Sequence, residues 1–453
     1  MNMSRESQND PREKKINILL LAVLSLFFFG LFAAFGTPIY NDSDQYIKMH
    51  VHREPVYPLF LFLLRSIIPD GYLTAASFLQ SVLCIIASYR FVTYVRATFR
   101  LNLPATVITA GLVTAPYILT PLFSKYHVQM SVAVMSESLA LPLYTLFIVQ
   151  LHKAVSGGQL HDLICSLFLS LLLTLTRTQM IFTFILWLIA AVYVSITFRR
   201  LAWIALSIVL FLGAFVLRDV GTRAYNYVFN GRYIDSVYSH INLLANILYV
   251  TDREDIDSIE DEELKEIASE LYSRADSAGY LYTYAGDRLT ERVVYLEEVH
   301  DRIKYDCIEY GLRDIVEEST GIHDYIEYNR IGDGYAGDLV GILLPKVFGR
   351  WFPDALLLGL RGVVRNIAVC RLPAYIYVCV LFALCVYMTI RLFAADKRDK
   401  AALFMSIAIL AVLGNSFSTA LVIMCLSRYM IYGFAGFYTG MLVCYNKFSC
   451  IRK

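Results

Sequence analysis

The chain has 453 residues, 57% of them apolar, and its mean hydropathy is +0.53. Soluble domains are usually about 45–50% apolar, so the composition excludes an ordinary soluble protein. The net charge is only +1, and no basic cluster stands free of an apolar run, which argues against a nucleic-acid-binding protein.

Apolar runs recur along the chain, and about 20 helical residues suffice to cross the hydrocarbon of a bilayer. The fold class is therefore an all-α polytopic membrane protein with about ten transmembrane helices. A cytoplasmic N-terminus places at least one Lys or Arg at every inner connection, as the positive-inside rule requires. We expect a bacterial plasma membrane, with both chain termini in the cytoplasm. The expected spans are 16–36, 72–95, 104–123, 134–153, 160–176, 180–198, 201–218, 372–391, 401–424 and 429–446.

Charge divides the chain into regions. Residues 219–371 carry 28 Asp/Glu and 16 Lys/Arg, a net of −12, and the rest of the chain carries +13. This acidic block is expected outside the cell, and apolar residues at helical spacing in 258–277 and 292–318 predict a mainly helical domain. The predicted regions are a cytoplasmic tail at 1–15, a transmembrane module at 16–218, the acidic extracytoplasmic domain at 219–371, and C-terminal helices with a cytoplasmic tail at 372–453.

The segment after the first span is the expected catalytic outer loop, residues 37–71. Asp42 and Asp44 emerge there within eight residues of the span, although Asp44 could instead cap a short helix. Arg53 stands beside them, and a guanidinium can hold a phosphate through paired donors. The run 56–68 is too short to span a bilayer and is bracketed by prolines, so it is expected as an outer juxtamembrane helix.

A divalent metal is a further expectation for this loop. Asp42, Asp44 and His52 could ligate one, because carboxylates and imidazoles are common metal ligands. The residues alone leave the metal requirement open.

Other polar residues fall at the outer ends of later spans. Glu137 opens the fourth span, where an acid usually marks a pathway or an ionic partner. Pairing with Arg177 or Lys125 would be a purely structural role for it. Arg177 closes the fifth span, and Arg428 with Tyr429 opens the last one. Snorkelling toward the membrane surface would explain either arginine taken singly.

These elements, in this order, resemble the GT-C class of membrane glycosyltransferases, which includes protein O-mannosyltransferases and the lipid A aminoarabinose transferase. The resemblance rests on the acidic motif Asn41-Asp42-Ser43-Asp44, the Pro-rich entry to the outer helix, Ser136-Glu137, Thr176-Arg177 and Arg428-Tyr429. It covers residues 16–220 well and 372–446 loosely. Thr178 stands where many relatives have proline.

The resemblance implies an inverting enzyme that takes a sugar from a polyprenyl-phosphate carrier and passes it to a glycan, lipid or protein acceptor on the outer face. Asp44 or Asp42 would be the general base, and Glu137 would orient substrate. Binding of the lipid phosphate would fall to Arg53, Arg177, Arg428, Tyr429 and Lys125.

Two other functions remain open from the residues. An O-antigen-type glycan polymerase or ligase would also use arginines at its outer face, but it needs no aspartate after the first span. A lipid or glycan transporter would be expected to place charges near mid-membrane and to show repeated halves with broken helices.

Overall fold

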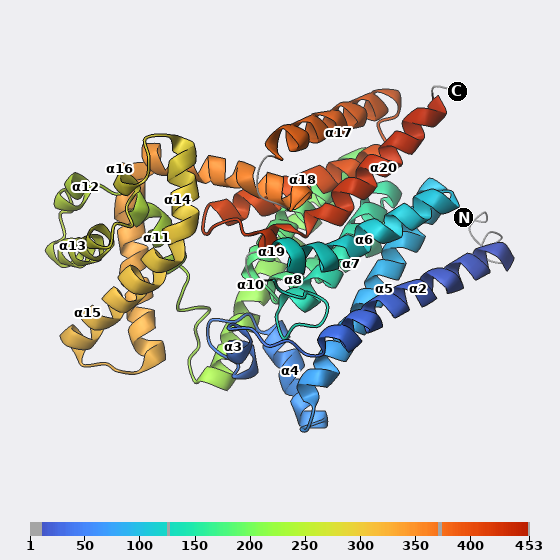
Figure 1. Ribbon diagram of the computed structural model, residues 1–453. Coiled ribbons are helices and arrows are strands. Elements are labelled where there is room, and N and C mark those ends of the chain that lie inside the picture. Colours follow the sequence, from blue (N-terminus) through green and yellow to red (C-terminus); the bar gives the residue numbers. More distant parts are fainter. Residues whose placement is uncertain (1–10, 125–126, 370–373, 452–453) are drawn as a thin grey trace. The chain divides into compact units, whose positions relative to one another are not determined.

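The computed structural model describes residues 11–124, 127–369 and 374–451, and every described secondary-structure element is helical (Figure 1). The predicted all-α class is thus confirmed. The described chain forms two compact units. The first comprises Met1–Tyr225, Val364–Asn415 and Ser427–Lys453, and the second comprises Asn226–Val363 and Ser416–Leu426.

Eight helical segments of the described chain are long and apolar enough to cross a membrane, which confirms a polytopic membrane protein. Two further predicted spans are α8 (Leu160–Thr174), with only 15 residues, and α20 (Gly433–Ile451), which are not among those eight. The total of ten therefore stays a prediction. The eight are α2 (Pro11–Phe35), α5 (Tyr72–Phe99), α6 (Leu103–Phe123), α7 (Glu137–Gly157), η1 (Thr178–Ile181) with α9 (Phe182–Thr197), α10 (Ala202–Asn230), α17 (Tyr375–Ala395) and α18 (Lys400–Ala420).

Consecutive long helices of the first unit run in opposite directions, as short connections favour. α2 lies along α5, α7 packs between α5 and α8, and α20 contacts α6 and α17 (Figure 1). Large apolar side chains remain exposed on the outward faces, among them Ile18 at 68% and Leu26 at 78%. Such exposure suits contact with lipid tails rather than water.

Three short helices lie at one end of this bundle: α3 (Ser43–Ile47), α4 (Val56–Ile67) and α19 (Ser427–Met430). The predicted juxtamembrane helix is α4, and its amphipathic surface buries Tyr57 and Leu61 while exposing Leu63. Its first amide donates to the Leu175 carbonyl at 2.9 Å, which fixes the start of α4 to the end of α8.

The second unit is built from α11 (Ile241–Tyr249), α12 (Arg253–Asp257), α13 (Glu262–Ser277), η2 (Tyr282–Tyr284), α14 (Leu289–Arg302), η3 (Ile303–Glu309), α15 (Tyr310–Thr320) and α16 (Tyr325–Ala368). The helix predicted from residue 258 begins later, because Asp261 accepts the Leu264 amide at 3.0 Å and caps α13. Ser258 instead ends α12.

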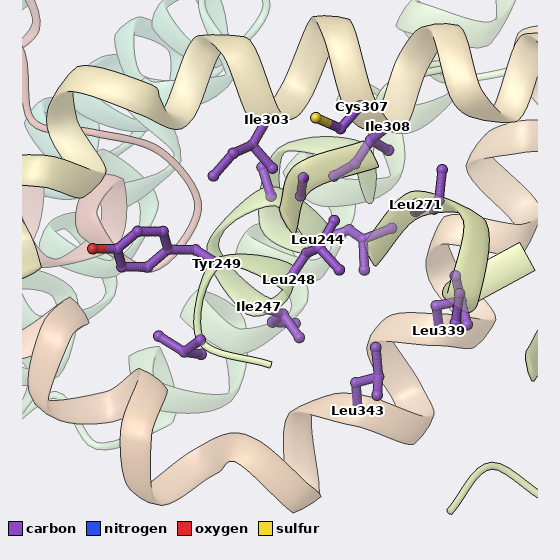
Figure 2. Close-up of a cluster of buried hydrophobic side chains, with 14 of the residues drawn as sticks. Leu244, Ile247, Leu248, Tyr249, Leu271, Ile303, Cys307, Ile308, Leu339 and Leu343 are labelled. Atoms are coloured by element: carbon purple, nitrogen blue, oxygen red, sulfur yellow. The ribbon is translucent and has the colours of Figure 1, made fainter. Parts of the chain in front are cut away.

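Its core is a cluster of apolar side chains around α11 (Figure 2). Leu244 and Leu248 from α11 meet Ile303 and Ile308 from η3, and Leu343 of α16 belongs to the same cluster. η3 is a π-helical segment, whose wider turn changes the register of the side chains that follow it. The described part of this unit therefore has a hydrophobic core of its own.

Candidate functional site

The predicted site residues come from connections that meet at one end of the first unit. α2 and α8 end there, and α7 and α9 begin there, because consecutive helices run in opposite directions. The segment that leads into α19 and α20 returns to the same end. The bundle therefore gathers side chains that are far apart in sequence.

A non-helical segment, residues 128–136, forms the base of this region and is almost fully buried. Non-helical backbone is tolerated at such depth only where protein groups satisfy its amides and carbonyls. Ser77 donates to the Val132 carbonyl at 2.6 Å, and Ser138 donates to the Ala133 carbonyl at 2.8 Å. Polar residues of the neighbouring helices thus fix the backbone that leads into Glu137.

Glu137 and Arg177 form a deeply buried ion pair. The Glu137 side chain is 1% exposed, and its Oε2 lies 2.7 Å from an Arg177 nitrogen. A nitrogen of Arg428 lies 3.9 Å from the other carboxylate oxygen. Arg177 also donates to Ser136 Oγ at 3.1 Å. The predicted ion pair between Glu137 and Arg177 is therefore present, and Arg428 lies beside the same carboxylate.

Asp42 lies between Arg53 and Arg428. Its Oδ1 accepts from Arg53 at 3.0 Å, and its Oδ2 lies 3.5 Å from Arg428. Gln45 holds Arg53 from the other side, through a hydrogen bond of 2.8 Å to Nε. The chain from Asp42 to Arg428 to Glu137 to Arg177 is thus continuous.

Aromatic rings lie under all three arginines. The Arg53 guanidinium carbon is 4.7 Å from the centre of the Tyr46 ring. Arg428 and Arg177 lie 4.8 Å and 5.2 Å from the centre of the same Tyr429 ring. Such contacts stabilise a cation that has lost water.

The five charged side chains of this group, which we call the arginine cluster, are Asp42, Arg53, Glu137, Arg177 and Arg428. They carry three positive and two negative charges. Burial alone would lower the pKa of Arg53, but Tyr46 and Asp42 outweigh it and raise the pKa above its usual value. The guanidinium therefore stays charged, and the cluster is suited to an anionic ligand.

Two of the predicted residues, Asp44 and His52, do not belong to the cluster. Asp44 is 61% exposed and pairs with Lys48 at 2.7 Å along the same short helix. The His52 ring packs against His50, with ring centres 4.6 Å apart. Among the described residues, no three His, Cys, Asp or Glu side chains are grouped to hold a metal, so Asp42, Asp44 and His52 form no such set. Lys125 lies outside the described residues.

Sequence analysis missed the polar residues that support the arginines. Gln179 and Asn415 hydrogen-bond to each other at 2.7 Å, and both reach the Tyr429 carbonyl. Tyr46 links Arg53 to Ser136, through contacts of 3.3 and 2.8 Å. The one available signal was spacing, because Gln179 follows Arg177 by two residues and belongs to the same turn.

Glu54 is a second residue that sequence analysis passed over. Its carboxylate accepts from Arg218 of α10 and from Thr178 at 2.7 Å, and Thr222 donates to it at 3.2 Å. Glu54, which directly follows Arg53, is thereby anchored to α10 and to η1. The loop that carries Arg53 is thus held from both sides.

A comparison of the chain with protein-family models, with curated proteins and with solved structures finds no match in any of the three.

Proposed function

We propose that the chain is a membrane glycosyltransferase that moves a sugar from a polyprenyl-phosphate carrier to an acceptor hydroxyl on the extracytoplasmic side of a plasma membrane. The observation that carries the proposal is the convergence of Arg53, Arg177 and Arg428 at one end of an apolar helix bundle. Guanidinium groups bind phosphate through paired donors. A carrier anchored by a long lipid tail would bring its phosphate to such a place.

In this mechanism the acceptor hydroxyl gives its proton to Asp42 as its oxygen attacks the anomeric carbon. The bond from that carbon to the phosphate oxygen breaks, and the carrier phosphate leaves with the electron pair. The three guanidinium groups stabilise the charge that develops on the leaving oxygen. In-line attack inverts the anomeric centre.

Asp42 suits the base better than Asp44 because it contacts two of the arginines that would hold the donor. Binding of phosphate by Arg53 and Arg428 would draw their donors from Asp42, leaving its oxygens to accept the proton. Glu137 is almost fully buried between Arg177 and Arg428, so its role would be to orient them.

Two buried polar atoms near the cluster support a ligand there. Arg177 Nε and the Tyr432 hydroxyl have no hydrogen-bond partner among the described residues. Tyr432 lies close enough to interact electrostatically with Arg177 and Glu137. Buried donors usually have partners, and a bound oxyanion or an ordered water would supply them.

Transfer of a radiolabelled sugar from polyprenyl-phosphate donors by the purified protein tests the proposal, with release of free polyprenyl phosphate as the readout. Asp42→Asn should lower the rate by about 10²- to 10⁴-fold, the usual contribution of a positioned base. Asp44→Asn is the matched control and should keep the native rate. If both variants transfer sugar at the native rate, Asp42 is not the base and the assignment is wrong.

Reconstituted vesicles separate transfer from transport. The labelled sugar could cross the bilayer without release of free polyprenyl phosphate and without a new glycosidic bond. That outcome would show that the protein is a transporter and not an enzyme.

A further inference from the structure

Two side-chain amides hold the main chain at Tyr429. Gln179 Nε2 donates to the Tyr429 carbonyl at 2.6 Å, and Asn415 Nδ2 donates to the same oxygen at 3.0 Å. Gln179 Nε2 also donates to Asn415 Oδ1 at 2.7 Å. The carbonyl belongs to α19, a helix of four residues, whose last carbonyls lie beyond the reach of intrahelical partners. The amides thus replace the bond that a longer helix would supply.

The same glutamine reaches one of the arginines. Arg177 NH2 donates to Gln179 Oε1 at 3.4 Å. The side-chain amides of Gln179 and Asn415 therefore each have a defined orientation. In both, the oxygen faces a donor and the nitrogen faces an acceptor. A flip of the Gln179 amide would place its nitrogen against the Arg177 guanidinium and its oxygen against two other oxygens. The network has one consistent arrangement.

The ring of Tyr429 lies against the guanidinium groups of both Arg177 and Arg428. Arg177 and Arg428 approach the same ring, and the Tyr429 hydroxyl accepts from Arg428 at 2.9 Å. Like charges so close repel each other, and the repulsion is strong where water is scarce. The ring sets how far apart the two cations stand, provided that its backbone does not move.

We propose that Gln179 and Asn415 are positioning residues that set the separation of the Arg177 and Arg428 guanidinium groups through the carbonyl and ring of Tyr429. Their effect is to shape a receptor for one tetrahedral phosphate group, the headgroup of the lipid carrier. The inference rests on the proposed function, in which those arginines hold the departing phosphate. Neither amide touches the substrate in this scheme.

Binding of decaprenyl phosphate to the detergent-purified full chain tests the proposal without requiring transfer. Gln179→Ala and Asn415→Ala should each weaken this binding by about tenfold, the usual effect of losing one buried hydrogen bond, because each variant removes one of the two bonds to the Tyr429 carbonyl. The double variant should bind no more weakly than about the worse single variant, because both amides act on one carbonyl. Gln159→Ala is the matched control, since Gln159 is exposed and remote from the cluster.

The variant Gln179→Glu adds a second measurement, the pH dependence of affinity, which should not change if Gln179 only stabilises the fold. Gln179→Glu loses both donated hydrogen bonds as a carboxylate, but regains one donor when protonated. Its affinity for decaprenyl phosphate, expressed relative to the native chain at each pH, should rise as the pH falls from about 8 to about 5.

The outcomes are distinguishable. If the native chain binds no decaprenyl phosphate, the proposed function fails. If the native chain binds and both alanine variants bind equally well, the positioning role fails and the proposed function stands. If the alanine variants unfold, the pH comparison of Gln179→Glu decides, and an unchanging ratio overturns the inference.

Discussion

Two groups of buried arginines, one in each unit of the chain, are paired with carboxylates differently. In the second unit, Arg292 pairs with Asp354 at 2.9 Å and Arg361 pairs with Glu297 at 2.6 Å. Each of these ion pairs joins α14 to α16. In the first unit, the three arginines of the arginine cluster share two carboxylates.

This difference distinguishes ion pairs that only stabilise the fold from a charged cluster suited to binding a ligand. A one-to-one buried pair balances its own charge, and apolar residues of similar size can often replace it without loss of stability. Three like charges brought around two opposite ones cost stability unless a further anion joins them. Unevenly matched ionisable groups in a buried place are typical of functional sites.

The largest expected effect follows from removing the arginine that the two carboxylates share. Arg428→Met leaves Arg53 with Asp42 and Arg177 with Glu137, so we expect the fold to survive. Sugar transfer should nevertheless fall by about 10²- to 10³-fold, as when one charge-stabilising group is lost from an active site. Transfer assays and thermal unfolding in detergent, run on the same preparation, measure both quantities.

Arg361→Met in the second unit is the matched comparison. It leaves Glu297 buried without this partner and should cost about 3–5 kcal/mol of unfolding free energy, most of which Arg361→Met/Glu297→Leu should restore. The distinction would be wrong if Arg428→Met failed to fold, or if Arg361→Met kept the native free energy of unfolding.

A smaller effect is expected from Glu137→Gln, which leaves Asp42 as the remaining carboxylate of the arginine cluster. This variant should lose about 2–4 kcal/mol of stability because a partner of buried cations is gone. Inorganic phosphate should recover part of the loss by binding the folded state. Unfolding measured with and without phosphate checks this, with Glu254→Gln on the second unit as a control that phosphate should not affect. Equal recovery in both variants would indicate a general salt effect.

The smallest effect concerns pH. Burial raises the pKa of Asp354 from 3.8 to about 6, although Arg292 acts to lower it. The folded chain therefore takes up a proton at this group before the unfolded chain does. Stability from Asp354 is lowest above about pH 6 and rises as the pH falls toward about 4, by at most about 3 kcal/mol. The native chain should gain stability relative to Asp354→Asn over that interval, and a constant difference would contradict the shift.

Much of the fold could be predicted because long apolar runs leave few alternatives to membrane helices. The 44-residue α16 could not, because Pro345, Pro353 and several glycines interrupt its pattern although the helix continues through them. α11 was also missed. Its nine residues are too few for periodicity to distinguish a buried helix from a strand.

The arginine cluster was predictable in part because charged residues near helix ends are few and each stands out. Asp44 and Asp42 could be separated only once α3 was known to begin at Ser43. Residues two apart on a helix point in nearly opposite directions, so Asp44 faces away from the arginines. Gln179 and Asn415 meet across more than two hundred residues of sequence, and no local pattern marks that encounter.

The short helix α8 has a consequence for the surroundings of the protein. Its 15 residues extend about 22 Å, whereas the hydrocarbon of a typical bilayer is about 30 Å thick. Arg177 follows three residues after its end, so the predicted span 160–176 would place this arginine below the headgroup plane of an undeformed bilayer. Under the proposed function, either the bilayer would thin around α8 or the carrier phosphate would descend to meet the guanidinium. The acyl-chain length of the surrounding lipids would thereby become a variable of the proposed reaction.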